Sequence, residues 1–141
     1  MKFETKKDRE RQKKACDKFC SVFDLLSIDK GEYSKVDYDL NNKNGYFIGS
    51  LEVKGCPDRK IEDSLTCQVA MRKLIDLQKY QNQTKKPAAI CWAFEDGIVY
   101  ERIENLFGTF KMGGRKPRAG SHHDIELMVS VEIKNLTKYY Y

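Results

Sequence analysis

Tyr33-Ser-Lys-Val-Asp-Tyr-Asp-Leu-Asn-Asn-Lys-Asn-Gly-Tyr-Phe-Ile-Gly-Ser-Leu-Glu-Val-Lys-Gly55 is the segment that decides the fold predicted for this chain. Asn44-Gly45, near its middle, is the strongest short-range sequence signal for a β-hairpin turn. The segments on either side of this dipeptide are of strand length, and the one after it is mostly apolar. The segment therefore predicts two antiparallel strands joined by a tight turn.

The turn determines which charged residues meet across the hairpin. With a two-residue loop, Asp37 lies opposite Glu52 and Lys35 lies opposite Lys54. Side chains on a strand alternate between faces, so Asp39 shares a face with Asp37, and Lys54 shares one with Glu52. A turn longer by two residues would make Asp39 the substitute for Asp37. A three-residue loop would move the carboxylates of one strand to the other side of the sheet.

Two carboxylates on neighbouring strands, with an ammonium two residues further on, form an oxygen-ligand site for a divalent cation. The alternative is a solvated hairpin face with cross-strand ion pairs. The flanking sequence favours the first interpretation, because residues 47–54 are mostly apolar on both faces. Charges in a strand covered on both sides are costly unless they are paired or bind a metal.

Asp37, followed fifteen residues later by Glu52-x-Lys54 in an apolar strand, resembles the motif of the PD-(D/E)xK nuclease superfamily. This resemblance implies a three-layer α/β fold of the restriction-endonuclease and junction-resolvase type, in which helices flank a central mixed sheet. It also implies Mg²⁺ or Mn²⁺ held by Asp37, Glu52 and the backbone carbonyl of Val53. Lys54 would then orient the attacking water or neutralise charge in the transition state.

Length and composition indicate one domain spanning residues 1–141, with 40% hydrophobic and 33% charged residues. The net charge of +5 favours a nucleic-acid partner. No apolar run approaches the length of a membrane span, and the first residues lack the apolar core of a signal peptide. We expect a cytoplasmic protein without a membrane partner, in the host cytoplasm if a phage encodes it.

The five cysteines, Cys16, Cys20, Cys56, Cys67 and Cys91, are odd in number and contain no Cys-x-x-Cys pair. Their spacing indicates neither a disulfide framework nor a common zinc site, and it does not match the four-cysteine cluster of some nucleases in the resembled superfamily. We expect buried or half-buried thiols. The adjacent His122 and His123 could bind a metal together with a cysteine, but two histidines beside Gly and Ser are more often exposed loop residues.

Residues 4–28 are predicted to form a helix whose first half is charged and whose second half has an apolar stripe. Lys13 and Lys14 in the charged half are candidates for phosphate contact, and a solvated basic arm is the alternative. Superfamily resemblance adds Glu10 and Glu4, because an N-terminal helix often supplies a carboxylate to the site.

A second helix is predicted from about residue 61 to Tyr80, with strands at 88–95 and 98–103. The order is α-β-β-α-β-β, and the core of the domain spans residues 33–103. In the resembled superfamily this helix often sends a Lys or Gln toward the metal. Lys73 and Gln78 are therefore candidates to support the site, as is Asp39, and exposed helix positions are the alternative for Lys73 and Gln78.

Residues 108–123 are rich in glycine and basic residues, and a last strand at 124–133 follows them. Candidate phosphate contacts in this region are Lys111, Arg115, Lys116 and Arg118. The segment lacks the Gly-Lys-Ser/Thr ending of a Walker loop, and a solvated connection is the alternative. Tyr139-Tyr140-Tyr141 could be a frayed end, a dimer contact or a base-stacking patch.

The leading hypothesis is a divalent-metal-dependent nuclease that hydrolyses DNA phosphodiester bonds, DNA being favoured over RNA. The resemblance implies an endonuclease that is structure-selective or weakly sequence-selective. Small members of the superfamily that recognise DNA structure usually act as homodimers, so the resemblance also implies a homodimer. The alternative is a non-catalytic module or inhibitor with the same fold that binds DNA or protein. The intact Asp, Glu and Lys set favours catalysis.

Overall fold

The computed structural model describes residues 5–114 and 125–141. Its helices and strands are, in chain order, α1 (Lys6–Phe23), β1 (Leu25–Asp29), β2 (Tyr38–Asn42), β3 (Phe47–Gly55), β4 (Thr66–Ala70), α2 (Met71–Thr84), β5 (Ala88–Ala93), β6 (Gly97–Arg102), β7 (Thr109–Gly114), β8 (Ile125–Glu132) and β9 (Thr137–Tyr140). Short 3₁₀ turns lie at Ile61–Asp63, Ile103–Asn105 and Ile133–Asn135.

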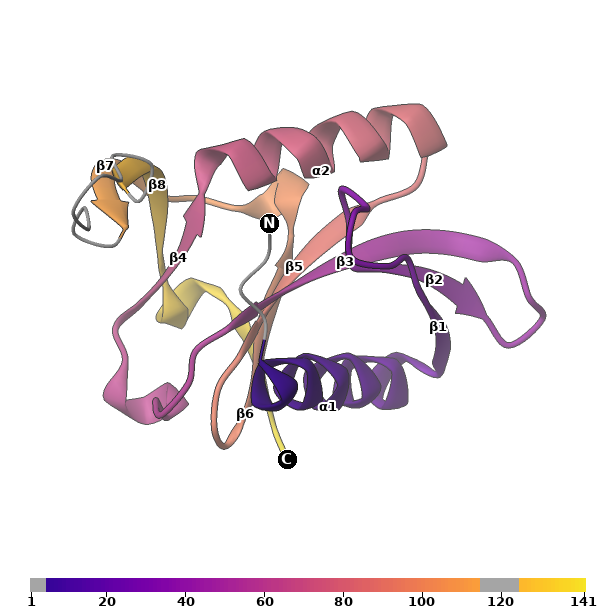
Figure 1. Cartoon of the computed structure of the whole chain (residues 1–141), viewed down its shortest axis with the longest axis horizontal. Coiled ribbons are helices and arrows are strands. Elements are labelled where there is room, and N and C mark those ends of the chain that lie inside the picture. Colours follow the sequence, from indigo (N-terminus) through magenta and orange to yellow (C-terminus); the bar gives the residue numbers. More distant parts are fainter. Residues whose placement is uncertain (1–4, 115–124) are drawn as a thin grey trace.

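A six-stranded sheet in the order β1-β2-β3-β5-β6-β9 forms the middle layer. Strands β3 and β5 are parallel and the other neighbours are antiparallel, so the sheet is mixed. Helices α1 and α2 lie on opposite sides of this sheet (Figure 1). The mixed α/β class and the layered arrangement predicted from the sequence are therefore confirmed.

A second sheet, in the order β4-β8-β7, stands beside the N-terminal end of α2 (Figure 1). This is a difference from the sequence analysis, which placed every strand on one sheet. Residues 61–70 were expected to be helical, but β4 occupies Thr66–Ala70, and α2 begins only at Met71. Cys67 and Val69 alternate into the core, and the Trp92 indole donates a hydrogen bond of 2.9 Å to the carbonyl of Gln68.

The first helix is shorter than the predicted helix at 4–28. It ends at Phe23 because Asp24 adopts the left-handed conformation, with φ 56° and ψ 53°, and its N–H closes the last turn on Cys20. The next residues, Leu25–Asp29, pair with β2 as an edge strand. The basic segment from residue 108 also differs, since β7 occupies Thr109–Gly114.

The β2–β3 hairpin has the expected register, but its turn is longer than expected and a bulge compensates for the extra residue. The pairs Tyr38–Leu51, Asp39–Ser50 and Leu40–Gly49 are those of the two-residue loop. The turn itself contains three residues, 43–45, closed by Asn42 and Tyr46. A β-bulge beside the turn leaves Ile48 of β3 without a partner on β2 and restores the pairing, so the third loop residue does not reverse the faces.

Two hydrophobic cores lie on the two sides of the large sheet. One joins α1 to the face that carries Leu51 and Val53, and the other joins α2 and the small sheet to the face that carries Ile90 and Trp92. All five cysteines are free and buried, as expected. No helix in the described parts of the chain has both the length and the apolar character needed to cross a membrane.

The C-terminal tyrosines belong to the sheet. Tyr139 and Tyr140 lie in β9 and pair with β6, and the Tyr139 ring stacks on that of Tyr100 with 6.0 Å between centroids. The Lys14 ammonium lies 4.1 Å from the centroid of the Tyr141 ring. This end of the chain is therefore an ordered edge strand and not a frayed tail.

Candidate nuclease active site

Asp37 lies immediately before β2, where the chain enters the hairpin. Its side chain is only 7% exposed, and Oδ2 accepts a hydrogen bond of 2.8 Å from the backbone N–H of Val53. The backbone carbonyl of Asp37 accepts a second bond, of 3.0 Å, from the N–H of Lys30. The carboxylate is thus fixed against β3, one residue beyond Glu52.

Glu52 lies in the middle of β3 and is also 7% exposed. The register of the hairpin puts it on the same face as Asp39 and, by alternation, Asp37. Helix α2 covers this face, and Lys73 in its first turn places Nζ 3.3 Å from Glu52 Oε2. A buried carboxylate is costly without such a partner, so Lys73 stabilises the charge on Glu52.

Lys54 follows on the same face of β3 and is half-buried. Burial lowers the pKa of its ammonium below the ordinary value. The guanidinium of Arg72 adds to this lowering, and the carboxylate of Glu126 opposes it. Within the described residues, Lys54 forms no ion pair, so its charge is available to a ligand in this part of the site.

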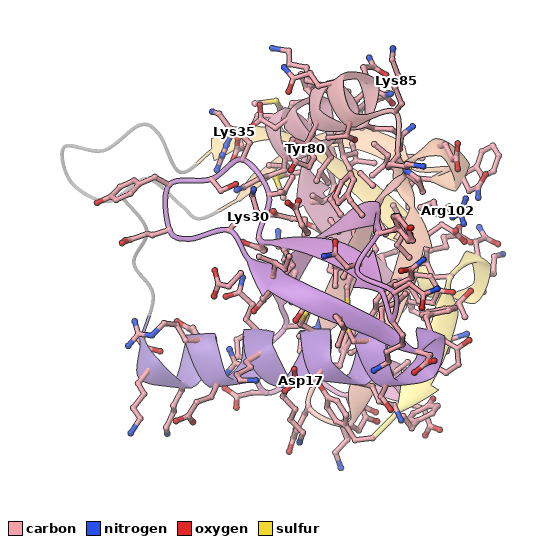
Figure 2. The ribbon with its side chains drawn as sticks, turned by 90° about the vertical axis from the view of Figure 1, so that its right-hand side faces the viewer. Asp17, Lys30, Lys35, Tyr80, Lys85 and Arg102 are labelled. Carbon is pink, nitrogen blue, oxygen red and sulfur yellow. The ribbon has the colours of Figure 1, made fainter. Side chains whose placement is uncertain are left out.

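Asp39, the acid within β2, is bonded to two donors. The hydroxyl of Tyr80 on α2 lies 2.7 Å from Oδ1, and the ammonium of Lys30 lies 3.1 Å from Oδ2. Partial burial and the hydrogen bond to Asp39 raise the pKa of Tyr80 to about 12. In Figure 2, Lys30, Lys35 and Tyr80 lie near one another beneath α2, whereas Asp17 lies on α1 at the opposite side.

Of the residues that the resemblance suggested around the site, Lys73 contacts Glu52 and Asp39 lies on the same sheet face. Gln78 is exposed and donates to Asn82 on its own helix, away from the site. Glu10 is exposed on α1, which packs on the other face of the sheet, and Glu4 lies outside the described residues.

Sequence reasoning missed Lys30 and Tyr80. Tyr80 had a signal, because it follows Lys73 by seven residues, which is two turns along the same face of a helix. Asp76 lies between them and approaches the Lys35 ammonium at 4.0 Å. Lys30 had no such sequence signal, because only the pairing of β1 with β2 brings it close to Asp39.

A cleft of about 460 Å³ opens beside Asp37 on the side of α1. The first half of α1 contributes Arg9, Gln12 and Lys13 to its wall, and the opposite wall carries acidic residues of the β1–β2 connection. Lys13 forms an exposed ion pair of 3.0 Å with Asp17. Lys14 faces Tyr141 and does not line this cleft, so the structure separates these two lysines.

The remaining candidates for phosphate contact lie elsewhere. Lys111 is exposed in the middle of β7, on the small sheet. Arg115, Lys116 and Arg118, together with His122 and His123, lie outside the described residues.

The carboxylate oxygens of Asp37 and Glu52 are the type of ligand that a hard divalent cation binds. Two buried carboxylates are connected through the Val53 amide, and oxygen ligands of this type are those that Mg²⁺ and Mn²⁺ prefer. In the described residues no group of three or more His, Cys, Asp or Glu side chains is arranged to hold a metal. Backbone carbonyls, solvent and substrate oxygens are further ligands of the kind that such a cation accepts.

Comparisons with known proteins place the chain in a family. The model of the family described as "Phage putative PDDEXK endonuclease" matches residues 1–139. The fold is similar to Hjc, a Holliday junction resolvase from the archaeal hyperthermophile Archaeoglobus fulgidus, with a TM-score of 0.56 and 12% identity over 89% of this chain and 86% of that one. No curated protein matches the sequence. The chain thus belongs to the PDDEXK-type phage endonuclease family and has a resolvase-like nuclease fold.

Proposed function

We propose that this protein is a divalent-metal-dependent endonuclease that hydrolyses phosphodiester bonds in DNA. The observation that carries the proposal is the shared sheet face of Asp37, Glu52 and Lys54, in which both carboxylates are buried and the lysine lacks an ion-pair partner among the described residues. In a member of an endonuclease family, this arrangement supports catalysis better than a structural role.

Asp37, Glu52 and the carbonyl of Val53 would hold Mg²⁺ or Mn²⁺. When bound, the cation supplies a Lewis acid for the phosphate and lowers the pKa of coordinated water. Lys54 orients the water or offsets charge that develops on the phosphate. Its lowered pKa follows from burial, and burial also strengthens its electrostatic action on a bound phosphate.

We propose that the substrate strand passes along the cleft beside Asp37, which among the described residues is the one member of the proposed catalytic set that lines it. Arg9 and Lys13 on its α1 wall provide positive charge for backbone phosphates, which contribute affinity without reading sequence. We therefore propose structure-selective or weakly sequence-selective cleavage by one domain that spans the chain. A homodimer acting in the host cytoplasm would suit such an activity.

Lys73 favours a second candidate, a DNA- or protein-binding module that has the fold and cuts nothing. Its ammonium already neutralises Glu52, so the site is electrostatically stable without a cation. Such a protein would keep its binding surface after Glu52 or Lys54 is replaced.

The test compares the natural protein with Glu52→Gln and Lys54→Met. Plasmid, linear duplex, single-stranded and four-way-junction DNA are incubated with Mg²⁺, Mn²⁺ or EDTA, and cleavage products are resolved on denaturing gels. Glu62→Gln and Lys60→Met serve as matched controls, because both residues are exposed in the segment after β3.

We expect cleavage that requires the metal and falls by at least about a hundredfold in both site variants, whereas both controls cleave like the natural protein. The distribution of product sizes distinguishes internal cuts from cuts at ends. If no substrate is cut, and DNA binding is indifferent to metal and to both site variants, the enzyme proposal fails and the binding module replaces it.

A further inference from the structure

The segment between β1 and β2 carries Asp37 into the site with few contacts of its own. Residues 30–35 are mostly exposed, and Tyr33 is 91% exposed. Local hydrogen bonds close its turns, from Gly31 N–H to the Asp29 carboxylate and from Ser34 N–H to the Gly31 carbonyl. Such bonds define the turn but do not attach the segment to the rest of the domain.

The segment is attached to the domain at its two ends. At the end nearer β2, Val36 is 1% exposed and packs in the core. The Lys35 ammonium beside it lies 4.0 Å from Asp76 on α2.

Lys30 connects the other end of the segment to β2. Its backbone N–H donates to the carbonyl of Asp37 at 3.0 Å, and its ammonium lies 3.1 Å from Asp39 Oδ2. One residue is therefore bonded to Asp37 through the main chain and to Asp39 through the side chain. Lys30 therefore links Asp39 to the main chain of Asp37, in addition to the bond from the Val53 N–H to the Asp37 carboxylate.

Tyr80 connects the same carboxylate to the helix. Its hydroxyl donates to Asp39 Oδ1 at 2.7 Å, a short bond to a charged acceptor. The Asp39 side chain is 16% exposed, so water competes weakly for these oxygens. Each of the two oxygens of Asp39 thus has a donor, one from Lys30, directly after β1, and one from Tyr80 on α2.

We propose that Asp39 is an anchor and not a metal ligand, and that Tyr80 and Lys30 are positioning residues that hold Asp37 in place. A cation at Asp39 would have to displace donors from both of its oxygens, whereas the same contacts stabilise Asp37 at the cleft. This inference rests on the proposed metal-dependent cleavage. It assigns the role of metal ligand to Asp37 and not to Asp39.

The effect on rate follows from the precision that catalysis needs. Displacement of a reacting group by about 1 Å can cost about a hundredfold in rate. Removal of one anchor contact should displace Asp37 by less than this, because the Val53 N–H still holds its carboxylate. We expect Tyr80→Phe to lower kcat about tenfold and to leave KM within about twofold.

The first measurement is Mn²⁺ binding by titration calorimetry, with the metal alone. The variants are Asp37→Asn, Asp39→Asn and Tyr80→Phe, and Tyr46→Phe is the control because Tyr46 lies 69% exposed in the hairpin turn. Asp37→Asn should abolish binding. Asp39→Asn and Tyr80→Phe should keep one site and weaken it by less than about tenfold, since they disturb the ligand only indirectly.

Conservative replacement separates positioning from folding. Lys30→Arg keeps a cation beside Asp39 and should restore most of the kcat that Lys30→Met loses, while both variants melt within a few degrees of the natural protein. Loss of Mn²⁺ binding in Asp39→Asn as complete as in Asp37→Asn would overturn the proposal. So would an unchanged kcat in Tyr80→Phe.

Amide hydrogen exchange tests the anchor without cleavage or metal. Tyr80→Phe should accelerate exchange of the Lys30 N–H, which is bonded to Asp37, and Tyr46→Phe should not. If the natural protein neither binds Mn²⁺ nor cuts DNA, the proposed function fails, and this exchange rate alone decides whether the anchor exists. Unchanged exchange in Tyr80→Phe would disprove the anchor.

Discussion

The two faces of β3 have opposite characters. On the side of α1, Leu51 is fully buried and Val53 nearly so, and they join a core made of α1 and the neighbouring strands. On the side of α2, the alternate positions are Ser50, Glu52 and Lys54. One strand of nine residues thus supplies apolar packing to one layer and ionisable groups to the other.

The difference shows how the fold accommodates buried charge. The apolar face contributes stability in proportion to the area it removes from water. The polar face has a cost, which the ion pair between Glu52 and Lys73 and the hydrogen bond from Val53 to Asp37 offset. Substitutions on the two faces should therefore have effects of different kind.

The largest expected effect on stability is on the α1 face. Leu51→Ala should lower the free energy of unfolding by about 3 kcal/mol, because it removes buried methyl groups and leaves a cavity. Urea denaturation measures the change. Cleavage per folded molecule should persist at low temperature, since Leu51 faces away from the site.

Ser50→Ala is the matched control on the α2 face. Ser50 is buried, and its hydroxyl has no hydrogen-bond partner in the described structure. Its removal should leave the free energy of unfolding within about 0.5 kcal/mol of the natural value. Equal losses in Leu51→Ala and Ser50→Ala would contradict the division between the two faces.

Replacement of Lys54 should change the free energy of unfolding by less than Leu51→Ala does, and in the opposite direction. Burial lowers the pKa of this ammonium in the folded chain, so at neutral pH its charge is less stable folded than unfolded. In the natural protein this cost disappears as pH rises from the lowered pKa toward the ordinary value of 10.5. Lys54→Met should raise the free energy of unfolding at neutral pH, by less than about 1 kcal/mol, while it abolishes cleavage.

The check is urea denaturation of both proteins at pH 7 and across the alkaline window. The natural protein should gain stability with rising pH relative to Lys54→Met, and the two curves should converge. If Lys54→Met were less stable than the natural protein at pH 7, Lys54 would stabilise the folded chain. Its burial would then not lower the free energy of unfolding.

The smallest effect on stability is expected on the outer surface of α1, where Lys13 and Lys14 are neighbours with different surroundings. Lys13→Gln removes a charge from the cleft wall, and Lys14→Gln removes one beside Tyr141. Neither should change the free energy of unfolding by more than about 0.5 kcal/mol. Lys13→Gln alone should weaken DNA binding and reduce the slope of log affinity against log salt by about 1.

Fluorescence anisotropy with labelled DNA at several salt concentrations measures both slopes. Equal slopes for Lys13→Gln and Lys14→Gln would show that the cleft does not contact phosphates. A larger loss in Lys14→Gln would move the DNA path toward the C-terminal edge of the sheet.

Local patterns predicted much of this molecule. The hairpin and the alternation of its charged residues follow from a period of two and one turn signal. The predicted register, in which Asp37 lies opposite Glu52, assumed a two-residue loop, and it holds because a bulge offsets the third residue of the turn. The bulge at Ile48 did not follow, because only the pairing of two strands reveals an extra residue. The helix expected at 61–80 was wrong in its first half. Val69 fits the period of a helix and the period of a strand, and it lies in a strand because it pairs with β8.

The sequence by itself determined that Glu52 and Lys54 share one face of their strand and that Asp37 and Asp39 share one, because strand alternation is a local geometric property of the chain. That the two pairs share the same face depended on the bulge at Ile48. Tertiary structure decided what surrounds them. Lys73 and Tyr80 reach Glu52 and Asp39 only because α2 crosses that face, and Lys30 reaches Asp39 only because β1 pairs with β2. Contacts between segments distant in the chain depend on how the layers pack, and no local periodicity specifies that packing.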